Sequence, residues 1–205
     1  MNPQALDLIR KYFPDNAVDA VAESFDQRQI RLEFCRPRTT KLGDFRAPRG
    51  RGSISRITLN CNLNPYQMLI TYVHELAHYD VHRQYGRKTQ PHGKEWKACY
   101  TALLQPYLRS DIFPEDILAA LQHHLQHVKA SSTADFNLTK VLKNYDKRDE
   151  RLVLVDDLPP RARFKAPNGM VFQKGEKMRK NYRCHCESNG RNYFVSGLLE
   201  VIQLD

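Results

Sequence analysis

Two histidines and a glutamate stand close together in the segment His74-Glu-Leu-Ala-His78. Because residues four positions apart share one face of an α-helix, both imidazoles can reach the same metal ion. Glu75 lies about 100° round the helix from His74, within reach of a water molecule at that metal. Two nitrogen ligands and a carboxylate base are the groups that zinc-assisted peptide hydrolysis uses. The spacing therefore predicts a zinc site in which Glu75 is the general base.

The flanking residues predict the helix that this geometry needs. Asn64 can cap the first free N–H groups, and Pro65 at the first helical position loses no hydrogen bond. Gly86 is a plausible end of the helix. The apolar residues between these ends recur with a period close to 3.6: Leu69, Val73, Leu76, Ala77 and Val81. The alternative is a chance match in a helix whose histidines are merely solvated.

A hydrolytic zinc site needs three protein ligands and one open position. The further candidates along the chain are His82, His92, Glu95, His123, His124 and His127. His82 lies about 12 Å along the helix axis from His74, which is too far for one ion. The longer metalloprotease pattern, with Gly three and His six residues after the second histidine, is not met, since Val81 and Gln84 stand there.

His92 is the preferred third ligand because it lies in a Pro-His-Gly turn just before a predicted helix from Lys94 to about Leu108. A polar loop over residues 85–91 could bring this turn back to the first helix. Glu95 is the alternative ligand, one turn further on. His123 and His127 fall outside the apolar stripe of a later helix, which favours a solvated position for both.

Taken together, His-Glu-Leu-Ala-His, a polar loop and Pro-His-Gly-x-x-Trp resemble the SprT family of zinc metalloproteases, which includes the eukaryotic Spartan proteases. The segments 38–45 (Arg-Thr-Thr-Lys-Leu-Gly-Asp-Phe) and 57–60 (Ile-Thr-Leu-Asn) also resemble that family, and the likeness covers about residues 30–110. The resemblance implies one Zn²⁺ ion on His74, His78 and His92, with Glu75 as the catalytic base. Many members end in a zinc ribbon with two cysteine pairs, whereas this chain has Cys184-His-Cys186 alone, which we interpret as an alternating strand.

The order of the predicted elements suits an α+β fold with a compact zincin-like metalloprotease domain, followed by a small all-β, barrel-like domain. The predicted elements of the first domain are helices at Gln4–Tyr12 and Asp15–Gln27, strands at Ile30–Arg36 and Ser53–Leu59, the metal helix, and a last helix from Pro114 to about Lys129. We expect residues 1–129 to form the protease domain, 130–150 a polar linker and 151–205 the β domain. Ser53–Leu59 is the candidate edge strand for pairing with a substrate.

The formal net charge of +9 favours polyanionic partners. The densest basic stretch, residues 36–56, is predicted to be a flexible loop that contacts nucleic acid through Arg46, Arg49, Arg51 and Arg56, with a solubilising surface loop as the alternative. The β domain is also basic and contains Phe164, Phe172, Tyr182 and Tyr193. These rings could stack on single-stranded nucleic acid, but the interpretation we favour is that they form the core.

No run is long enough for a membrane helix, the N-terminus has no signal-peptide pattern, and the five cysteines are scattered. A cytoplasmic location follows as the expectation. From the motif and the resemblance together we predict a zinc-dependent endopeptidase with protein substrates. The resemblance to the Spartan-type proteases further implies substrates that are associated or crosslinked with DNA. The alternative is a nucleic-acid-binding protein whose zinc is structural and whose proteolysis is vestigial.

Overall fold

The structure is a computed structural model, and it describes residues 3–28, 30–50, 52–126, 128, 135–147 and 149–205. The chain forms two compact units, Met1–Asp146 and Lys147–Asp205. Within the described residues there are six α-helices and two β-sheets, so the fold belongs to the α+β class. Among these helices, none has both the length and the apolar character that a membrane span requires.

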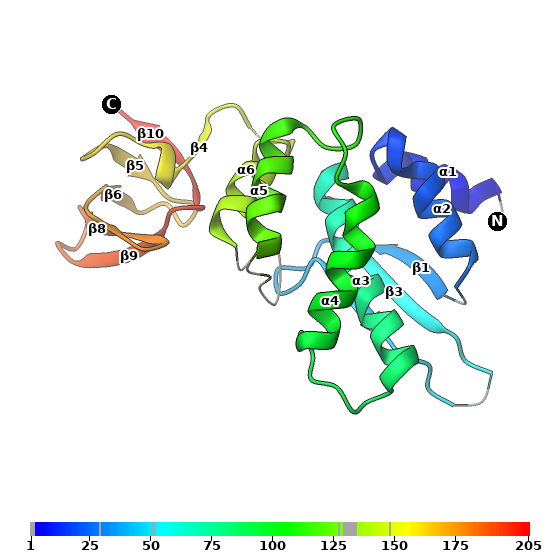
Figure 1. The fold of residues 1–205 in the computed structure, drawn as a ribbon. Helices are drawn as coiled ribbons and strands as arrows, with labels where there is room; N and C mark the ends of the chain where they lie inside the picture. Colours follow the sequence, from blue (N-terminus) through cyan, green and yellow to red (C-terminus); the bar gives the residue numbers. More distant parts are fainter. Residues whose placement is uncertain (1–2, 29, 51, 127, 129–134, 148) are drawn as a thin grey trace. The chain divides into compact units, whose positions relative to one another are not determined.

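The first unit combines all six helices with the smaller sheet (Figure 1). The helices are α1 (Pro3–Tyr12), α2 (Val18–Asp26), α3 (Pro65–Tyr85), α4 (Lys94–Leu104), α5 (Glu115–Gln126) and α6 (Phe136–Lys143), and short 3-10 turns, η1 (Asp15–Ala17) and η2 (Gln105–Tyr107), precede α2 and follow α4. The strands are β1 (Ile30–Cys35), β2 (Gly43–Arg46) and β3 (Ser55–Asn60). Helix α4 ends earlier than expected because Pro106 has no N–H to continue the α-helical ladder.

Strand β3 lies in the middle of the three-stranded sheet, in the order β1-β3-β2. It pairs with β1 in parallel and with β2 in antiparallel orientation, and Ile57 and Leu59 are fully buried. The prediction that Ser53–Leu59 is an edge strand is therefore wrong. In the described part of the chain the edges are β1 and β2, and β2 packs against α3.

Strand β2 also corrects the prediction of a flexible basic loop over residues 36–56. The Phe45 ring packs against the rings of Tyr79 and His82 on α3, with centroid distances of 6.0 and 5.8 Å. Asp44 forms salt bridges with Lys41 and Arg46 at 2.8 and 2.7 Å. The aromatic contacts of the partly buried Phe45 and the charge of Asp44, which balances the neighbouring Lys41 and Arg46, thus hold part of this basic segment in the sheet.

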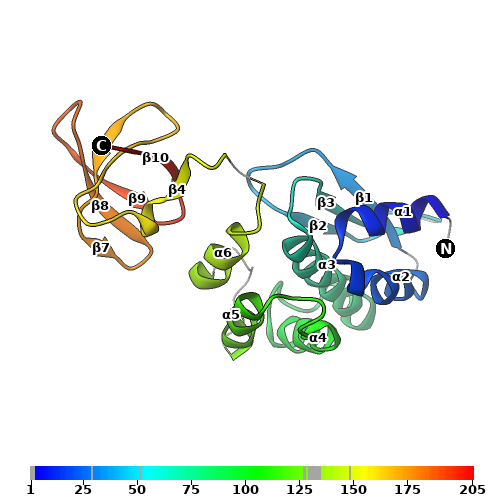
Figure 2. The ribbon, with the colours of Figure 1, turned by 90° about the horizontal axis from the view of Figure 1, so that it is seen from above.

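Helix α3 is the element on which the candidate site is built, and it matches the sequence prediction closely. The Asn64 side chain accepts a hydrogen bond from the Gln67 N–H at 2.9 Å, and Gly86 ends the helix with φ 65°. Helix α3 packs against strands β2 and β3 on one side and against α4 on the other (Figure 2). Because both sides are covered, most of its central residues are buried.

Helix α6 lies within the segment predicted to be a linker. Its Leu138 and Leu142 belong to the core of the first unit and are 0% and 1% exposed. The Asn64 amide at the start of α3 donates hydrogen bonds to the Leu142 carbonyl at 2.9 Å and to the Asp146 carboxylate at 2.7 Å. The linker prediction over 130–150 was therefore wrong for α6, because polar composition concealed two leucines spaced one helical turn apart. Residues 129–134, including the predicted helix end at Lys129, lie outside the described residues.

The second unit is an antiparallel sheet that curls round a small core of its own. Its strands are β4 (Leu152–Leu154), β5 (Arg163–Lys165), β6 (Val171–Gln173), β7 (Lys177–Met178), β8 (Asn181–Cys186), β9 (Asn192–Ser196) and β10 (Glu200–Leu204), with a 3-10 turn, η4 (Val155–Asp157), after β4. Phe164, Phe172 and Tyr182 are buried in this core, which confirms the core interpretation for these three rings. Tyr193 is 37% exposed, at the margin of the core.

Candidate metal centre

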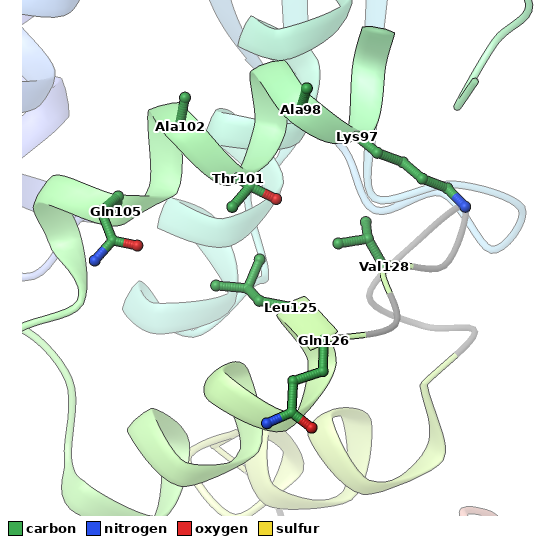
Figure 3. A pocket seen from close by; sticks show the side chains of 8 residues that line it. All are labelled: Lys97, Ala98, Thr101, Ala102, Gln105, Leu125, Gln126 and Val128. Atoms are coloured by element: carbon green, nitrogen blue, oxygen red, sulfur yellow. The ribbon is translucent and has the colours of Figure 1, made fainter. Parts of the chain in front are cut away.

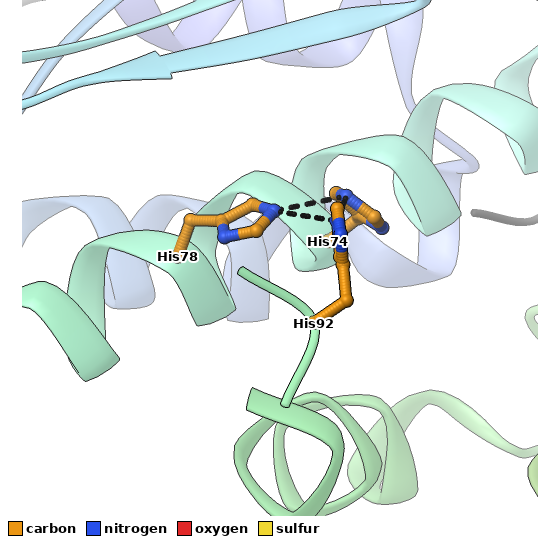
Figure 4. Close-up of side chains that lie close together, drawn as sticks. All are labelled: His74, His78 and His92. Carbon is orange, nitrogen blue, oxygen red and sulfur yellow. Dashed lines mark hydrogen bonds between the residues drawn. The ribbon is translucent and has the colours of Figure 1, made fainter. Parts of the chain in front are cut away.

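Three imidazole rings meet at one point in the first unit (Figure 4). The Nε2 atom of His78 lies 3.1 Å from that of His74 and 3.0 Å from that of His92, and the third Nε2 pair is 3.2 Å apart. His74 and His78 come from one face of α3, and His92 comes from the turn before α4. The structure thus brings together the three histidines that the sequence singled out.

The turn that carries His92 has an uncommon backbone conformation. His92 has φ 60°, in the left-handed region, and the following Gly93 N–H donates to the Gln90 carbonyl at 3.0 Å. A left-handed residue other than glycine costs about 1–2 kcal/mol. Such strain is typical of positions where a side chain has to point at a functional site. Here it directs the imidazole toward α3.

The spacing of the three nitrogens matches the dimensions of a tetrahedral metal site. Zinc binds imidazole nitrogen at about 2.0–2.1 Å, so two ligands at the tetrahedral angle stand about 3.3 Å apart. The observed separations of 3.0–3.2 Å are close to this value. Among the described residues no other group of His, Cys, Asp or Glu side chains converges in this way. The donor set therefore fits a metal ion, and three imidazoles suit zinc among several transition metals.

Burial keeps these imidazoles in the neutral form that binds metal. Desolvation, reinforced by His78 and His92, lowers the pKa of His74 to about 3. Desolvation and the nearby His92 lower the pKa of His78 to about 4, and burial also lowers the pKa of His92. Protons therefore compete weakly for the three nitrogens near neutral pH.

Trp96 forms the floor beneath the three imidazoles. Its ring centroid lies 4.6 Å from that of His74, 5.3 Å from that of His78 and 4.7 Å from that of His92. It is 1% exposed, and its other face stacks on Tyr100 at 5.0 Å. The sequence marked Trp96 only as part of the family-like motif, although its place four residues after His92 is the signal that links it to the site.

Glu75 lies under strand β2, nearly buried at 6% exposure. Burial, followed by the negative charge of Asp44, raises its pKa to about 8, while a hydrogen bond from the Phe45 backbone acts in the opposite direction. Gly43 leaves the room that the carboxylate occupies. A Cβ on Gly43 would lie 2.7 Å from both Cγ and Oε1 of Glu75 and 2.8 Å from Cγ2 of Thr71. The sequence did not identify Gly43 as a residue that positions Glu75.

The other candidate ligands lie outside the cluster. Glu95 is paired with Lys94 at 3.8 Å, and His82 packs on Phe45. His123 is exposed, in line with the prediction of a solvated position, whereas His127 lies outside the described residues. His124 is 1% exposed, and its Nδ1 is 3.1 Å from an Asp135 carboxylate oxygen. That pair joins α5 to the start of α6, a role that sequence reasoning missed.

Two of the four predicted nucleic-acid-binding arginines are engaged within the protein. Arg46 pairs with Asp44 at 2.7 Å, and Arg56 pairs with Glu33 at 3.5 Å. Arg49 is exposed and makes no ion pair within the described residues, and Arg51 lies outside them. The structure therefore places Arg46 and Arg56 on neighbouring strands with acidic partners, so their charge is partly balanced at the surface.

A separate hollow of about 890 Å³ lies beside α4 and the end of α5 (Figure 3). Its lining residues are Lys97, Ala98, Thr101, Ala102, Gln105, Leu125, Gln126 and Val128. Among the described lining residues there is no imidazole, carboxylate or thiol. The described part of the lining thus lacks the groups from which a hydrolytic or metal-binding site is built, in contrast to the cluster of His74, His78 and His92.

Comparison with known proteins agrees with this geometry. The model of the SprT-like family matches residues 11–113, half of the chain, and the chain therefore belongs to the SprT-like family. The matched segment includes β1, β2, β3, α3 and α4 and all four residues of the predicted zinc site. Neither a curated protein nor a solved structure matches the chain. The family in general is metalloprotease-like, which supports an enzyme.

Proposed function

We propose that this protein is a zinc-dependent endopeptidase with a zincin-like catalytic unit. One observation carries the proposal: the Nε2 atoms of two histidines on α3 and of His92 in the turn before α4 lie within 3.2 Å of one another, and α3 also carries the buried Glu75. Membership of the SprT-like family supports it. His74, His78 and His92 would hold the ion, and the chain would use one ion per catalytic unit.

Glu75 has the position of a general base. We infer that it accepts a proton from the attacking water and later delivers it to the amine of the leaving peptide. When bound, zinc supplies positive charge that lowers the pKa of water, polarises a peptide carbonyl and opposes the effect of burial on the pKa of Glu75. The Phe45 backbone hydrogen bond orients the Glu75 carboxylate, and Gly43 leaves space for it.

The substrate would approach along β2. Within the described residues β2 pairs on one side only, and its Phe45 backbone contacts Glu75. Extended peptides commonly bind by adding a strand to such an edge. We therefore propose β2 as the pairing edge, in place of the strand that sequence analysis favoured.

The alternative, a structural zinc in a protein that has lost proteolysis, predicts a closed site with four protein ligands. In the described part of the chain the cluster has three members. Its geometry favours an open fourth position, which is the arrangement of catalytic zinc sites.

We further propose that nucleic-acid-associated proteins are substrates. Two features support this proposal. The chain has a net charge of +9, and one face of the second unit combines basic side chains with an exposed aromatic ring. There the strand register places Arg183 opposite Phe194 and His185 opposite Asn192, and Phe194 is 68% exposed. An exposed ring beside a guanidinium suits stacking of a nucleic-acid base.

This proposal is tested by titrating a fluorescent oligo-dT into Glu75→Gln protein. We expect the affinity to fall several-fold when Phe194→Ala is added to this protein. Adding Ile202→Ala, which changes another exposed apolar residue of the same unit, should leave the affinity unchanged.

The decisive experiment compares two glutamate variants. Zinc-loaded wild type, Glu75→Gln and Glu95→Gln are incubated with a basic DNA-binding protein, with and without single-stranded DNA. We expect Glu75→Gln to keep its zinc and lose activity by about 10²–10⁴-fold, while Glu95→Gln keeps both. Equal proteolysis by wild type and Glu75→Gln would refute the role of Glu75, and inactivity of all three proteins would support the structural-zinc alternative.

A further inference from the structure

A cavity of about 310 Å³ opens directly beside two of the three clustered histidines. His78 and His92 form part of its wall, so a group that enters it lies next to two of the three clustered imidazoles. Strand β2 contributes Phe45 and the loop after α3 contributes Arg87. The cavity thus connects the proposed pairing edge to the metal cluster.

The inner wall of the cavity is mainly apolar. Phe45, Val81, Pro91 and Trp96 line it, and Val81 and Trp96 are 7% and 1% exposed. Phe45 is held against the ring of His82, which also lines the cavity. Pockets with apolar walls and a few polar groups recognise apolar side chains through the area they remove from water. The volume is sufficient for one aromatic or branched aliphatic side chain.

The permanent charge in the cavity lining comes from an arginine. Among the described lining residues Arg87 alone has a permanent charge, and none of them has a carboxylate. Arg87 is exposed and makes no hydrogen bond or ion pair within the described part of the chain. A lysine or arginine side chain in this cavity would meet the Arg87 guanidinium without a compensating carboxylate, which is unfavourable.

We propose that this cavity is a specificity pocket that accepts a large apolar or aromatic substrate side chain next to the scissile bond and rejects a lysine or arginine there. This inference rests on the proposed endopeptidase function. The size preference is assigned to the apolar wall and the charge preference to Arg87. Polar groups at the rim, including Thr89, allow a tyrosine hydroxyl to be hydrogen-bonded as well.

The size preference is tested by narrowing the cavity. Thr89→Trp places a large ring in the lining, and Lys88→Trp is the matched control at the neighbouring exposed residue, which does not line the cavity. Peptides that differ only at the residues flanking one cleavable bond are digested, and the products are identified by mass spectrometry. We expect wild type and Lys88→Trp to cleave beside Phe, Tyr or Leu at least about tenfold faster than beside Ala, and Thr89→Trp to lose that preference. The same preference in both tryptophan variants would overturn the proposal.

The charge preference is tested by Arg87→Glu, with Lys88→Glu as the control of equal charge change. We expect Arg87→Glu to increase cleavage beside Lys by about tenfold relative to cleavage beside Leu, and Lys88→Glu to leave the ratio unchanged. An equal effect of the two variants would assign the preference to overall charge and refute the role of Arg87.

Binding separates failure of this proposal from failure of the protease assignment. Fluorescein-labelled peptides with Phe, Ala or Lys at the flanking position are titrated into zinc-loaded Glu75→Gln protein, and anisotropy is recorded. Tighter binding of the Phe peptide, lost in Glu75→Gln/Thr89→Trp, supports the pocket even if no peptide is cleaved. Equal affinity for the three peptides overturns the pocket, whatever the proteolysis assays show.

Discussion

Helix α3 and strand β8 both carry histidine or cysteine side chains, which can bind metal, close together in sequence. The two elements arrange these side chains in opposite ways. On α3, His74 and His78 share one face, and their Nε2 atoms are 3.1 Å apart. On β8, Cys184 and Cys186 point into the core at 0% exposure, while His185 between them is exposed. The side-chain periodicity of the element decides whether neighbouring ligands converge. On a helix, two residues four positions apart lie on the same face, whereas on a strand three consecutive residues alternate between the two faces.

The two regions also differ in what the rest of the fold adds. The turn before α4 supplies His92 to the α3 pair, and Trp96 supports all three rings. Cys186 of β8 instead contacts the Ser188 hydroxyl at 3.1 Å, and Cys184 belongs to the core of the second unit. A pair of ligands becomes a metal site only when a distant segment completes it.

The sharpest test of this comparison removes one candidate ligand from each region. We expect His78→Ala to lower zinc affinity by more than about 100-fold. Mutating a residue that only hydrogen-bonds to a metal ligand typically lowers metal affinity by about 10–100-fold, and removing a ligand itself should cost more. Cys184→Ala should leave zinc content unchanged. Metal analysis after dialysis at fixed free zinc measures both, and a comparable loss in the cysteine variant would contradict the distinction between the two regions.

The extent of the first unit is tested by truncation. A chain ending at residue 129 lacks Leu138 and Leu142, and each buried leucine contributes about 2–5 kcal/mol. Because typical stabilities are about 5–15 kcal/mol, we expect this fragment to be unfolded or strongly destabilised and a fragment ending at residue 146 to fold and bind zinc. Circular dichroism melting distinguishes them. Equal melting of the two fragments would show that α6 contributes little.

Two glycines allow each region to be disturbed separately. Gly43→Ala would force Glu75 to move, since the new Cβ would lie 2.7 Å from its Oε1, and a displacement of about 1 Å can cost about 100-fold in rate. Gly175→Ala would place a Cβ 2.0 Å from the Arg183 carbonyl oxygen and should destabilise the second unit by about 1–3 kcal/mol. We expect Gly43→Ala to retain zinc but lose proteolysis, and Gly175→Ala to keep the proteolysis rate of wild type. Unchanged proteolysis in Gly43→Ala together with a loss in Gly175→Ala would contradict the inference that Gly43 positions Glu75.

The smallest expected effect concerns the strained turn at His92. Both His92→Gly and His92→Ala should lose zinc, but glycine tolerates φ 60° without steric cost. We expect metal-free His92→Gly to be more stable than metal-free His92→Ala by about 0.5–1 kcal/mol. Urea unfolding in the presence of a chelator measures the difference, and a less stable glycine variant would show that the backbone there relaxes.

Much of the site was predictable because it depends on local rules. The i, i+4 spacing on α3, the Asn64 cap and the Gly86 end are determined within one helix, and the structure contains all three. The strands of the second unit were largely predictable for the same reason, since their alternation and their turns at Gly169 and Gly190 are local signals.

The features that sequence reasoning missed depend on contacts between distant segments. The sequence of β2 is typical of a basic loop, and its place in the sheet depends on the packing of Phe45 against Tyr79 of α3. Helix α6 looked like a linker because its two core leucines are diluted by polar neighbours. The exposure of Phe194 could not be distinguished from burial, since adjacent aromatic residues on β9 face opposite sides.

The sequence by itself determined the chemistry: two imidazoles on one helix face, a carboxylate beside them and a third histidine in a turn. The tertiary structure decided the geometry: which distant histidine completes the cluster, which strands lie at the edges of the sheet, and why a glycine lies over Glu75. The physical reason is that helix periodicity acts over a few residues, whereas convergence of side chains depends on packing between elements far apart in the chain.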